Sequence, residues 1–178
     1  MPNECDNQIS FEGDKSEIDE FIKLVFDEES HNTHRFINCK GMLQKIVTFP
    51  NKKVSELLLR EIFKGNYIGY DAELDKSSIF FKTKWGANDT PILYLSYLFP
   101  NIKFTYVYDE PNEGFEGESI FKNGKVISDT VIDFASSTPT LMIHKMNHKT
   151  VEDIKNEYQS LFDSYPSAKI EFCEERLY

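Results

Sequence analysis

The 178-residue sequence lacks several features that identify common protein classes. Its three cysteines are widely spaced and odd in number, so neither a disulfide framework nor a cysteine-rich zinc site is indicated. No stretch has the length and apolar character of a membrane span, and the first residues lack the basic and apolar regions of a signal peptide. We therefore expect a cytoplasmic protein with no membrane partner.

Motifs for catalysis are also missing. The sequence contains no G-x-G-x-x-G or Walker-type loop, no G-x-S-x-G elbow and no H-E-x-x-H segment. Two histidine pairs, His31 with His34 and His144 with His148, have spacings that suit metal ligands, but no third ligand is evident from spacing. We predict a protein that is not an enzyme and that holds no cofactor and no metal.

Basic residues are scarce relative to acidic ones. The chain has 30 Asp and Glu against 20 Lys and Arg, which gives a formal net charge of −10. This charge repels phosphate backbones and favours a positively charged partner surface. A basic host or phage protein is therefore the expected partner and direct nucleic-acid binding is not expected, whereas the oligomeric state stays open.

Apolar residues are abundant enough for a hydrophobic core, at 40% hydrophobic and 14% aromatic. The most informative stretch is 78–131. Its residues alternate over 79–85 and again over 102–108, which predicts two strands, and the spacing from Ile92 to Phe99 predicts a helix between them. Asn123-Gly124 predicts a two-residue hairpin turn. A strand, helix and strand followed by a hairpin indicate an α+β fold.

The flanking segments fit the same core. Residues 7–12 predict a strand, and Ser16 is the predicted cap of a helix that follows it. Residues 27–75 are predicted to be an insertion after that helix, with a second helix near 54–62.

The C-terminal segment, 132–178, is expected to extend this core. Thr150 and Asp153 predict a capping box that opens a helix, and alternation at 168–172 predicts a strand after it. We therefore expect a single domain over 1–178.

Several short motifs follow one another along the chain: Met1-Pro2-Asn3-x-Cys5-x-Asn7, Phe81-x-Thr83-Lys84-Trp85, Leu95-Ser96-x-x-Phe99-Pro100 and Phe115-x-Gly117. Together they resemble the YubB ferredoxin-like family, small proteins of phages, plasmids and other mobile elements. The resemblance runs from the N-terminus to about Val131, and Glu4 departs from the aromatic residue usual in that family. It implies a ferredoxin-like sandwich, an antiparallel sheet with helices on one face, and no established reaction.

A dense run of acidic residues lies between two predicted strands, at Asp109, Glu110, Glu113, Glu116 and Glu118. Their spacing does not match the D-x-D-x-D-G-x5-E pattern of a calcium loop. We expect an exposed hairpin loop, and loops held by a rigid sheet often carry binding function. The run is therefore a candidate site for a basic protein.

Aromatic residues supply the other candidate binding positions. Trp85, the sole tryptophan, ends a predicted strand, where it is either an interface anchor or, more commonly for this residue, part of the core. Tyr106 and Tyr108 share one strand face with Phe104 and would stack on bases if that face were open.

These observations favour a non-catalytic accessory protein of a phage or mobile element that binds or inhibits a host factor through an acidic surface. One alternative is a domain that binds single-stranded nucleic acid through the sheet aromatics. Another is a metal-dependent hydrolase, which needs two or three carboxylates to converge in space. A pocket holding Asp109 or Glu110 beside other acids would favour that alternative.

Overall fold

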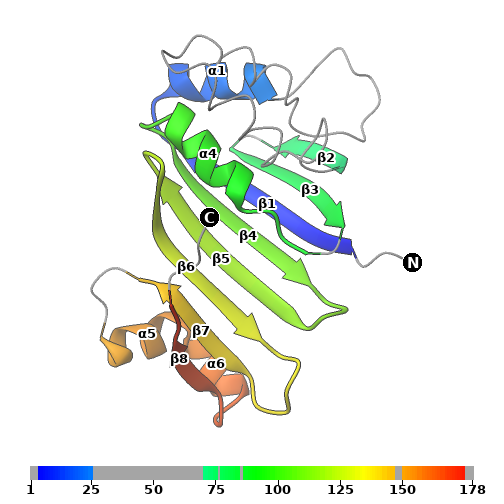
Figure 1. Cartoon of the computed structure of the whole chain (residues 1–178), viewed down its shortest axis with the longest axis vertical. Helices are drawn as coiled ribbons and strands as arrows, with labels where there is room; N and C mark the ends of the chain where they lie inside the picture. The colour runs from blue at the N-terminus through cyan, green and yellow to red at the C-terminus, as the bar shows by residue number, and fades with distance from the viewer. Residues whose placement is uncertain (1–3, 26–69, 76, 85, 147–149, 175–178) are drawn as a thin grey trace.

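A computed structural model of the chain describes residues 4–25, 70–75, 77–84, 86–146 and 150–174. This part of the chain forms an eight-stranded sheet in the order β2-β3-β1-β4-β5-β6-β7-β8 (Figure 1). The strands are β1 (Glu4–Glu12), β2 (Tyr70–Asp75), β3 (Ser78–Lys84), β4 (Lys103–Glu110), β5 (Phe115–Lys122), β6 (Lys125–Asp133), β7 (Thr140–Lys145) and β8 (Lys169–Phe172). The helices are α1 (Lys15–Val25), α4 (Thr90–Leu98), α5 (Val151–Glu157) and α6 (Gln159–Ser164).

The first half of the sheet has ferredoxin-like topology. Elements β1, α1, β2, β3, α4 and β4 follow one another in the described part of the chain, and β1 lies between β3 and β4. Each of these strands pairs antiparallel with its neighbours. This is the β-α-β-β-α-β arrangement, so the predicted α+β, ferredoxin-like fold is confirmed.

The second half of the sheet extends this unit. Strands β5, β6 and β7 continue antiparallel from β4, and β8 pairs parallel with β7. A parallel pair needs a crossover connection, which α5 and α6 provide. The hairpin turn predicted between β5 and β6 is confirmed, because Asn123 and Gly124 have φ values of 51° and 66°.

Helix starts follow the expected capping chemistry with one change. The Asp14 carboxylate accepts hydrogen bonds from the backbone N–H groups of Ser16, at 2.9 Å, and Glu17, at 3.4 Å. Asp14, and not the predicted Ser16, therefore caps α1. Thr150 and Asp153 form the predicted capping box at the start of α5.

Two hydrophobic cores lie on opposite faces of the sheet. Val131 belongs to the core beneath α1 and α4, whereas the next residue, Ile132, belongs to a core with Ile154 and Leu161 of α5 and α6. Successive residues of a strand point to opposite faces, so the two helix pairs cover different faces. The expectation that the helices lie on one face is therefore wrong.

The larger core contains most of the residues that the alternation patterns predict. It joins Phe21 of α1, Ile92 and Leu95 of α4, and the inward residues of the central strands. Those strand residues are Cys5, Ile9, Phe11, Ile79, Phe81, Phe104, Tyr106, Tyr108 and Phe121.

The predicted insertion, 27–75, is only partly within the described residues. Its last residues, Tyr70–Asp75, form β2 at the edge of the sheet, so that end of the predicted boundary is wrong. The helix predicted near 54–62 lies outside the described residues. Among the helices described, none is long and apolar enough to cross a membrane.

Candidate functional site

The acidic run is split between two strands and a short turn. Asp109 and Glu110 end β4, Glu116 and Glu118 lie in β5, and Glu113 lies in the turn between them. The predicted exposed loop is therefore wrong for all but Glu113. Because strand side chains alternate, Asp109 and Glu110 point to opposite faces of the sheet, whereas Glu116 and Glu118 share one face.

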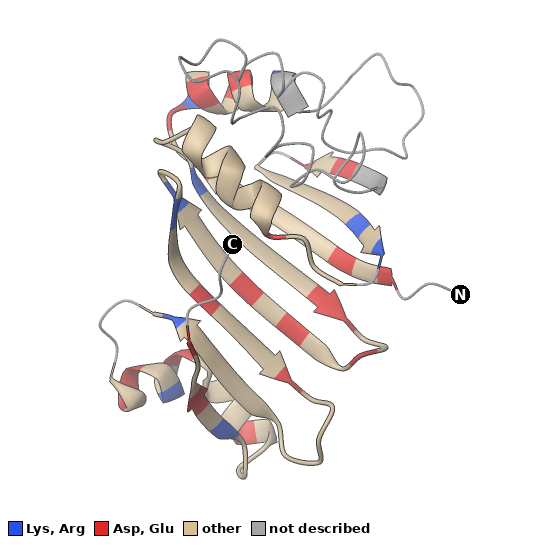
Figure 2. Cartoon of the chain, in the orientation of Figure 1, with Lys and Arg blue, Asp and Glu red and all other residues tan. Residues whose placement is uncertain are grey.

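Three carboxylates form a row across the face of the sheet opposite α4. Asp6 of β1 pairs in register with Asp109, and Asp109 pairs with Glu116. We call Asp6, Asp109 and Glu116 the acidic row. Figure 2 shows Asp and Glu on these central strands, and the lysines of β4 and β5 lie at the opposite strand ends, at Lys103 and Lys122.

Only one end of the acidic row is neutralised among the described residues. Lys82 of β3 lies 3.6 Å from Asp6 and 3.2 Å from Glu4. Asp109 and Glu116 have no ion-pair partner in the described part of the chain. Like charges directly opposite each other destabilise a sheet, so the row costs folding energy.

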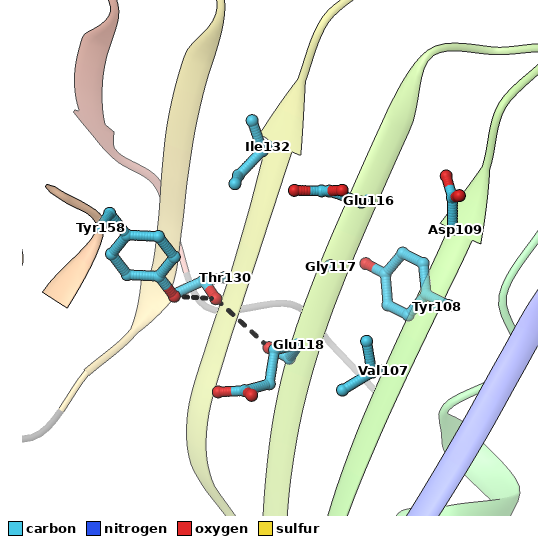
Figure 3. Close-up of a pocket in the computed structure, with 9 residues that line it drawn as sticks. All are labelled: Val107, Tyr108, Asp109, Glu116, Gly117, Glu118, Thr130, Ile132 and Tyr158. Atoms are coloured by element: carbon cyan, nitrogen blue, oxygen red, sulfur yellow. Dashed lines mark hydrogen bonds between the residues drawn. The ribbon is translucent and has the colours of Figure 1, made fainter. Parts of the chain in front are cut away.

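A pocket of about 250 Å³ opens beside the acidic row (Figure 3). It lies at the edge of the layer formed by α5 and α6, over a part of β4 and β5 that no described helix covers on this face, with Tyr158 at its helical side. The lining residues are Val107, Tyr108, Asp109, Glu116, Gly117, Glu118, Thr130, Ile132 and Tyr158. In Figure 3 the Glu116 side chain lies between Ile132 and Asp109, as the strand register requires.

Hydrogen bonds fix the helical side of the pocket. The hydroxyl groups of Tyr158 and Thr130 lie 2.9 Å apart, and the Thr130 hydroxyl donates to the backbone oxygen of Glu118 at 3.4 Å. Burial raises the pKa of Tyr158, so its hydroxyl stays protonated at neutral pH. Partial burial and then the charge of Asp109 raise the pKa of Glu116, a shift that a bound cation would oppose.

Glu110 does not contribute to this surface. It lies on the α4 face of β4 and is fully shielded from solvent, and its carboxylate oxygens have no hydrogen-bond partner among the described residues. Burial raises its pKa, followed by repulsion from Glu113. Its inclusion among the surface acids is therefore wrong, because strand alternation turns it inward.

Tyr106 and Tyr108 are also turned inward. They are 0% and 2% exposed and belong to the larger core, so neither ring is open for stacking on a base. The condition for the nucleic-acid alternative, an open face carrying Phe104, Tyr106 and Tyr108, is not met.

A buried polar network holds Tyr106 in place. Its hydroxyl donates to Asn7 Oδ1 at 2.5 Å and accepts the N–H of Asn88 at 3.0 Å. The Asn7 amide donates to Thr83 Oγ1 at 3.0 Å and to the backbone oxygen of Cys5 at 2.8 Å. The network joins β1, β3 and β4 to the segment before α4.

Burial raises the pKa of Cys5 to about 11, which keeps its thiol protonated and unreactive.

Several predicted positions lie outside the described residues. These are Trp85, the histidines His31, His34 and His148, and Cys39. His144 lies in β7, with Nδ1 3.0 Å from the backbone oxygen of Glu174. Among the described residues, no three His, Cys, Asp or Glu side chains form a group that could hold a metal ion.

The sequence analysis missed four of the nine residues that line the pocket: Val107, Thr130, Ile132 and Tyr158. It named Asp109 and Glu116 as candidate binding residues. Alternation in β6 was a usable signal, because it places Thr130 and Ile132 on one face. Only the tertiary structure brings Tyr158 beside them.

The sequence of the chain was compared with known protein families, and the matched region can be placed on the fold and the pocket. A family model described as a ferredoxin-like domain in Api92-like protein matches residues 66–155. The chain belongs to this family. The region matched to the Api92-like domain runs from β2 into α5 and contains Asp109 and Glu116, whereas Asp6 and Tyr158 lie outside it. No curated protein and no solved structure matches the chain.

Proposed function

We propose that this protein is a non-catalytic binding module whose acidic row binds a basic host or phage protein. Within the Api92-like group we place it with the YubB-like proteins of phages and mobile elements, acting in the cytoplasm as an accessory protein or inhibitor of a host factor. The observation that carries the proposal is the register of Asp6, Asp109 and Glu116 across three adjacent strands.

The energetic argument concerns the unrelieved charge. Directly opposed carboxylates weaken strand pairing, and a positively charged partner would remove that repulsion on binding. Exposed carboxylates also speed the encounter with a basic surface at low salt. The net charge of −10 acts in the same direction over the whole molecule.

The two alternatives have less support. For single-stranded nucleic acid, the aromatic residues in question are buried, and the opposite face of the same strands carries the acidic row. For a metal-dependent hydrolase, the pocket does bring Asp109 beside Glu116, but the described residues contain no metal-binding group of three. We therefore keep the protein-binding function as the proposal.

A pull-down from bacterial lysate with the full chain tests the proposal. The wild type is compared with the double variant Asp109→Asn/Glu116→Gln at about 50 mM and about 300 mM salt, since screening weakens surface charge interactions over this range. We expect a basic protein in stoichiometric amount, lost at the higher salt and lost with the double variant.

The matched control is Glu113→Gln/Glu171→Gln, which removes the same charge from the turn and from β8. This control should keep the partner. A partner retained equally by all three proteins, or retained unchanged at the higher salt, would show that the acidic row is not the binding surface.

A further inference from the structure

We propose that the pocket beside the acidic row receives the side chain of a single arginine of the bound partner. This inference rests on the proposed function and goes further, because it names the group that enters the pocket. The acidic row alone would attract any cation. The pocket adds shape and an apolar lining, and these select among cations.

The floor of the pocket is formed by side chains from three adjacent strands, β4, β5 and β6. In one row of the sheet, Ile132, Glu116 and Asp109 are register neighbours, and in the next row Thr130, Glu118 and Val107 are neighbours. The two carboxylates Glu116 and Asp109 are thus flanked by apolar groups, Ile132 in their own row and Val107 in the next. Such a lining suits a ligand that has an apolar stem and a charged head.

Arginine fits this pattern better than a simple cation. Its three methylene groups can lie against Val107, which is 39% exposed, and against the edge of the buried Ile132 that lines the pocket. Its planar head carries five N–H donors in a fixed fork, so it can donate to two carboxylates at once. Cross-strand neighbours such as Asp109 and Glu116 have Cβ atoms about 4.5–5.5 Å apart, a spacing that one guanidinium can bridge.

Tyr158 gives the pocket an aromatic side. Its hydroxyl is held 2.9 Å from that of Thr130, which anchors the end of the side chain. Aromatic rings attract a guanidinium group placed within about 6 Å of the ring centre. Lysine would gain less here, because its ammonium is more strongly hydrated and lacks the flat surface that stacks on a ring.

The test is an NMR titration of the isotope-labelled full chain with Nα-acetylarginine methylamide. We expect saturable shifts at the backbone amides of Gly117 and Thr130, at millimolar ligand. The citrulline analogue has nearly the same shape without the charge and should bind about tenfold more weakly, as should arginine to the Asp109→Asn/Glu116→Gln variant. The Glu113→Gln/Glu171→Gln control should bind as the wild type does.

Three results would overturn the arginine pocket: no saturable shifts at Gly117 and Thr130, equal binding of citrulline, or tighter binding of the lysine analogue. The failure of this inference is separable from that of the proposed function. If the pull-down partner is lost with the Asp109→Asn/Glu116→Gln variant but arginine does not bind, the acidic row stands and the arginine pocket is wrong. If arginine binds but the Asp109→Asn/Glu116→Gln variant still captures the partner as the wild type does, the proposed function is wrong.

Discussion

At the scale of single residues, the motifs that carry the family resemblance are mainly structural. Asn7 and Thr83 hold the buried polar network, and Ser96 accepts the N–H of Gly124 at 3.1 Å, which ties α4 to the hairpin turn. None of these residues lines the pocket. Among the named motif residues the exception is Gly117, which lines the pocket, so the residues that identify the fold and those proposed to bind a partner overlap only at that glycine.

Asn7→Ala should strongly destabilise the fold. The substitution leaves the Tyr106 hydroxyl without its acceptor and Thr83 without its amide donor, both in the interior. An unsatisfied buried polar group costs about 1–3 kcal/mol, so we expect a loss of about 2–3 kcal/mol in urea unfolding.

The control for Asn7 is its neighbour Gln8, which lies half-buried on the opposite face of β1. Gln8→Ala should change stability by about 0.5 kcal/mol or less. The double variant Asn7→Ala/Tyr106→Phe should lose less stability than the sum of the losses in the two single variants, because both substitutions remove the same hydrogen bond. Fully additive losses would contradict the network.

Glu110→Gln should stabilise the protein, and more at neutral than at acidic pH. Burial raises the pKa of Glu110 in the folded state, so the folded state holds its proton to higher pH than the unfolded state does. The free energy of unfolding of the wild type therefore falls as pH rises from the unfolded pKa through the folded one. The charged, unpartnered carboxylate destabilises the fold above that window, and glutamine removes this penalty.

Urea unfolding at about pH 4 and about pH 7 measures the effect. The gain from Glu110→Gln should be present at neutral pH and nearly absent in acid. Glu113→Gln, which removes a charge from the exposed turn, separates repulsion from burial. If both variants give the same gain at neutral pH, burial of Glu110 is not the cause.

At the scale of elements, prediction succeeded where the side-chain period was strong. Residues 102–108 have an apolar or aromatic side chain at every even-numbered position, and these side chains are all at most 2% exposed. The Asn123-Gly124 turn was predictable because few other residue pairs accept positive φ at both positions.

The prediction of secondary structure failed where the amino-acid composition of a segment and the periodicity of its apolar side chains disagreed. The segment 109–118 is rich in Asp, Glu, Pro, Asn and Gly, which is typical of a loop, yet all but its turn belongs to β4 and β5. Strand β2 has a weak apolar pattern because it lies at the sheet edge, where it pairs on one side only among the described strands. Backbone pairing with β3 stabilises it, and single-sequence patterns do not report such pairing.

Gly117→Ala should disrupt the pairing of β4 with β5. A Cβ atom at position 117 would overlap Cζ and Oη of Tyr108, whose ring crosses this glycine from the paired strand. Overpacking of this kind costs about 1–3 kcal/mol, and urea unfolding measures it. Because the clash is with one ring, Gly117→Ala should cost much less in a Tyr108→Ala background. An equal cost in both backgrounds would mean that the backbone of β5, not the ring, requires glycine.

At the scale of the whole molecule, the pocket follows from the two-sided arrangement of the helices. The sheet carries α1 and α4 on one face and α5 and α6 on the other, and the second pair covers only the strands beyond β5 (Figure 1). Among the described elements, no helix covers the rest of that face, and Tyr158 at its boundary forms the pocket wall. The sequence did not reveal this, because it predicts which residues are apolar but not which face of a sheet a late helix covers.

The two cores should nevertheless unfold together. Strand β6 belongs to both, through Val131 and Ile132, and it pairs with β5 on one side and β7 on the other. Loss of the second core would therefore remove β7 from β6 and weaken the first core as well. This predicts one cooperative transition for the domain expected over 1–178.

Ile154→Ala tests that cooperativity from the far end of the sheet. Ile154 is fully buried in the second core, so its truncation should cost about 2–5 kcal/mol. Far-UV circular dichroism and the fluorescence of Trp85, which directly follows β3 in the sequence, should shift to lower urea together and by the same amount. An early step in circular dichroism with an unchanged fluorescence transition would mean that the second core is a separate folding unit. The pocket would then span two units, and its affinity for a partner would depend on how firmly they are joined at β6.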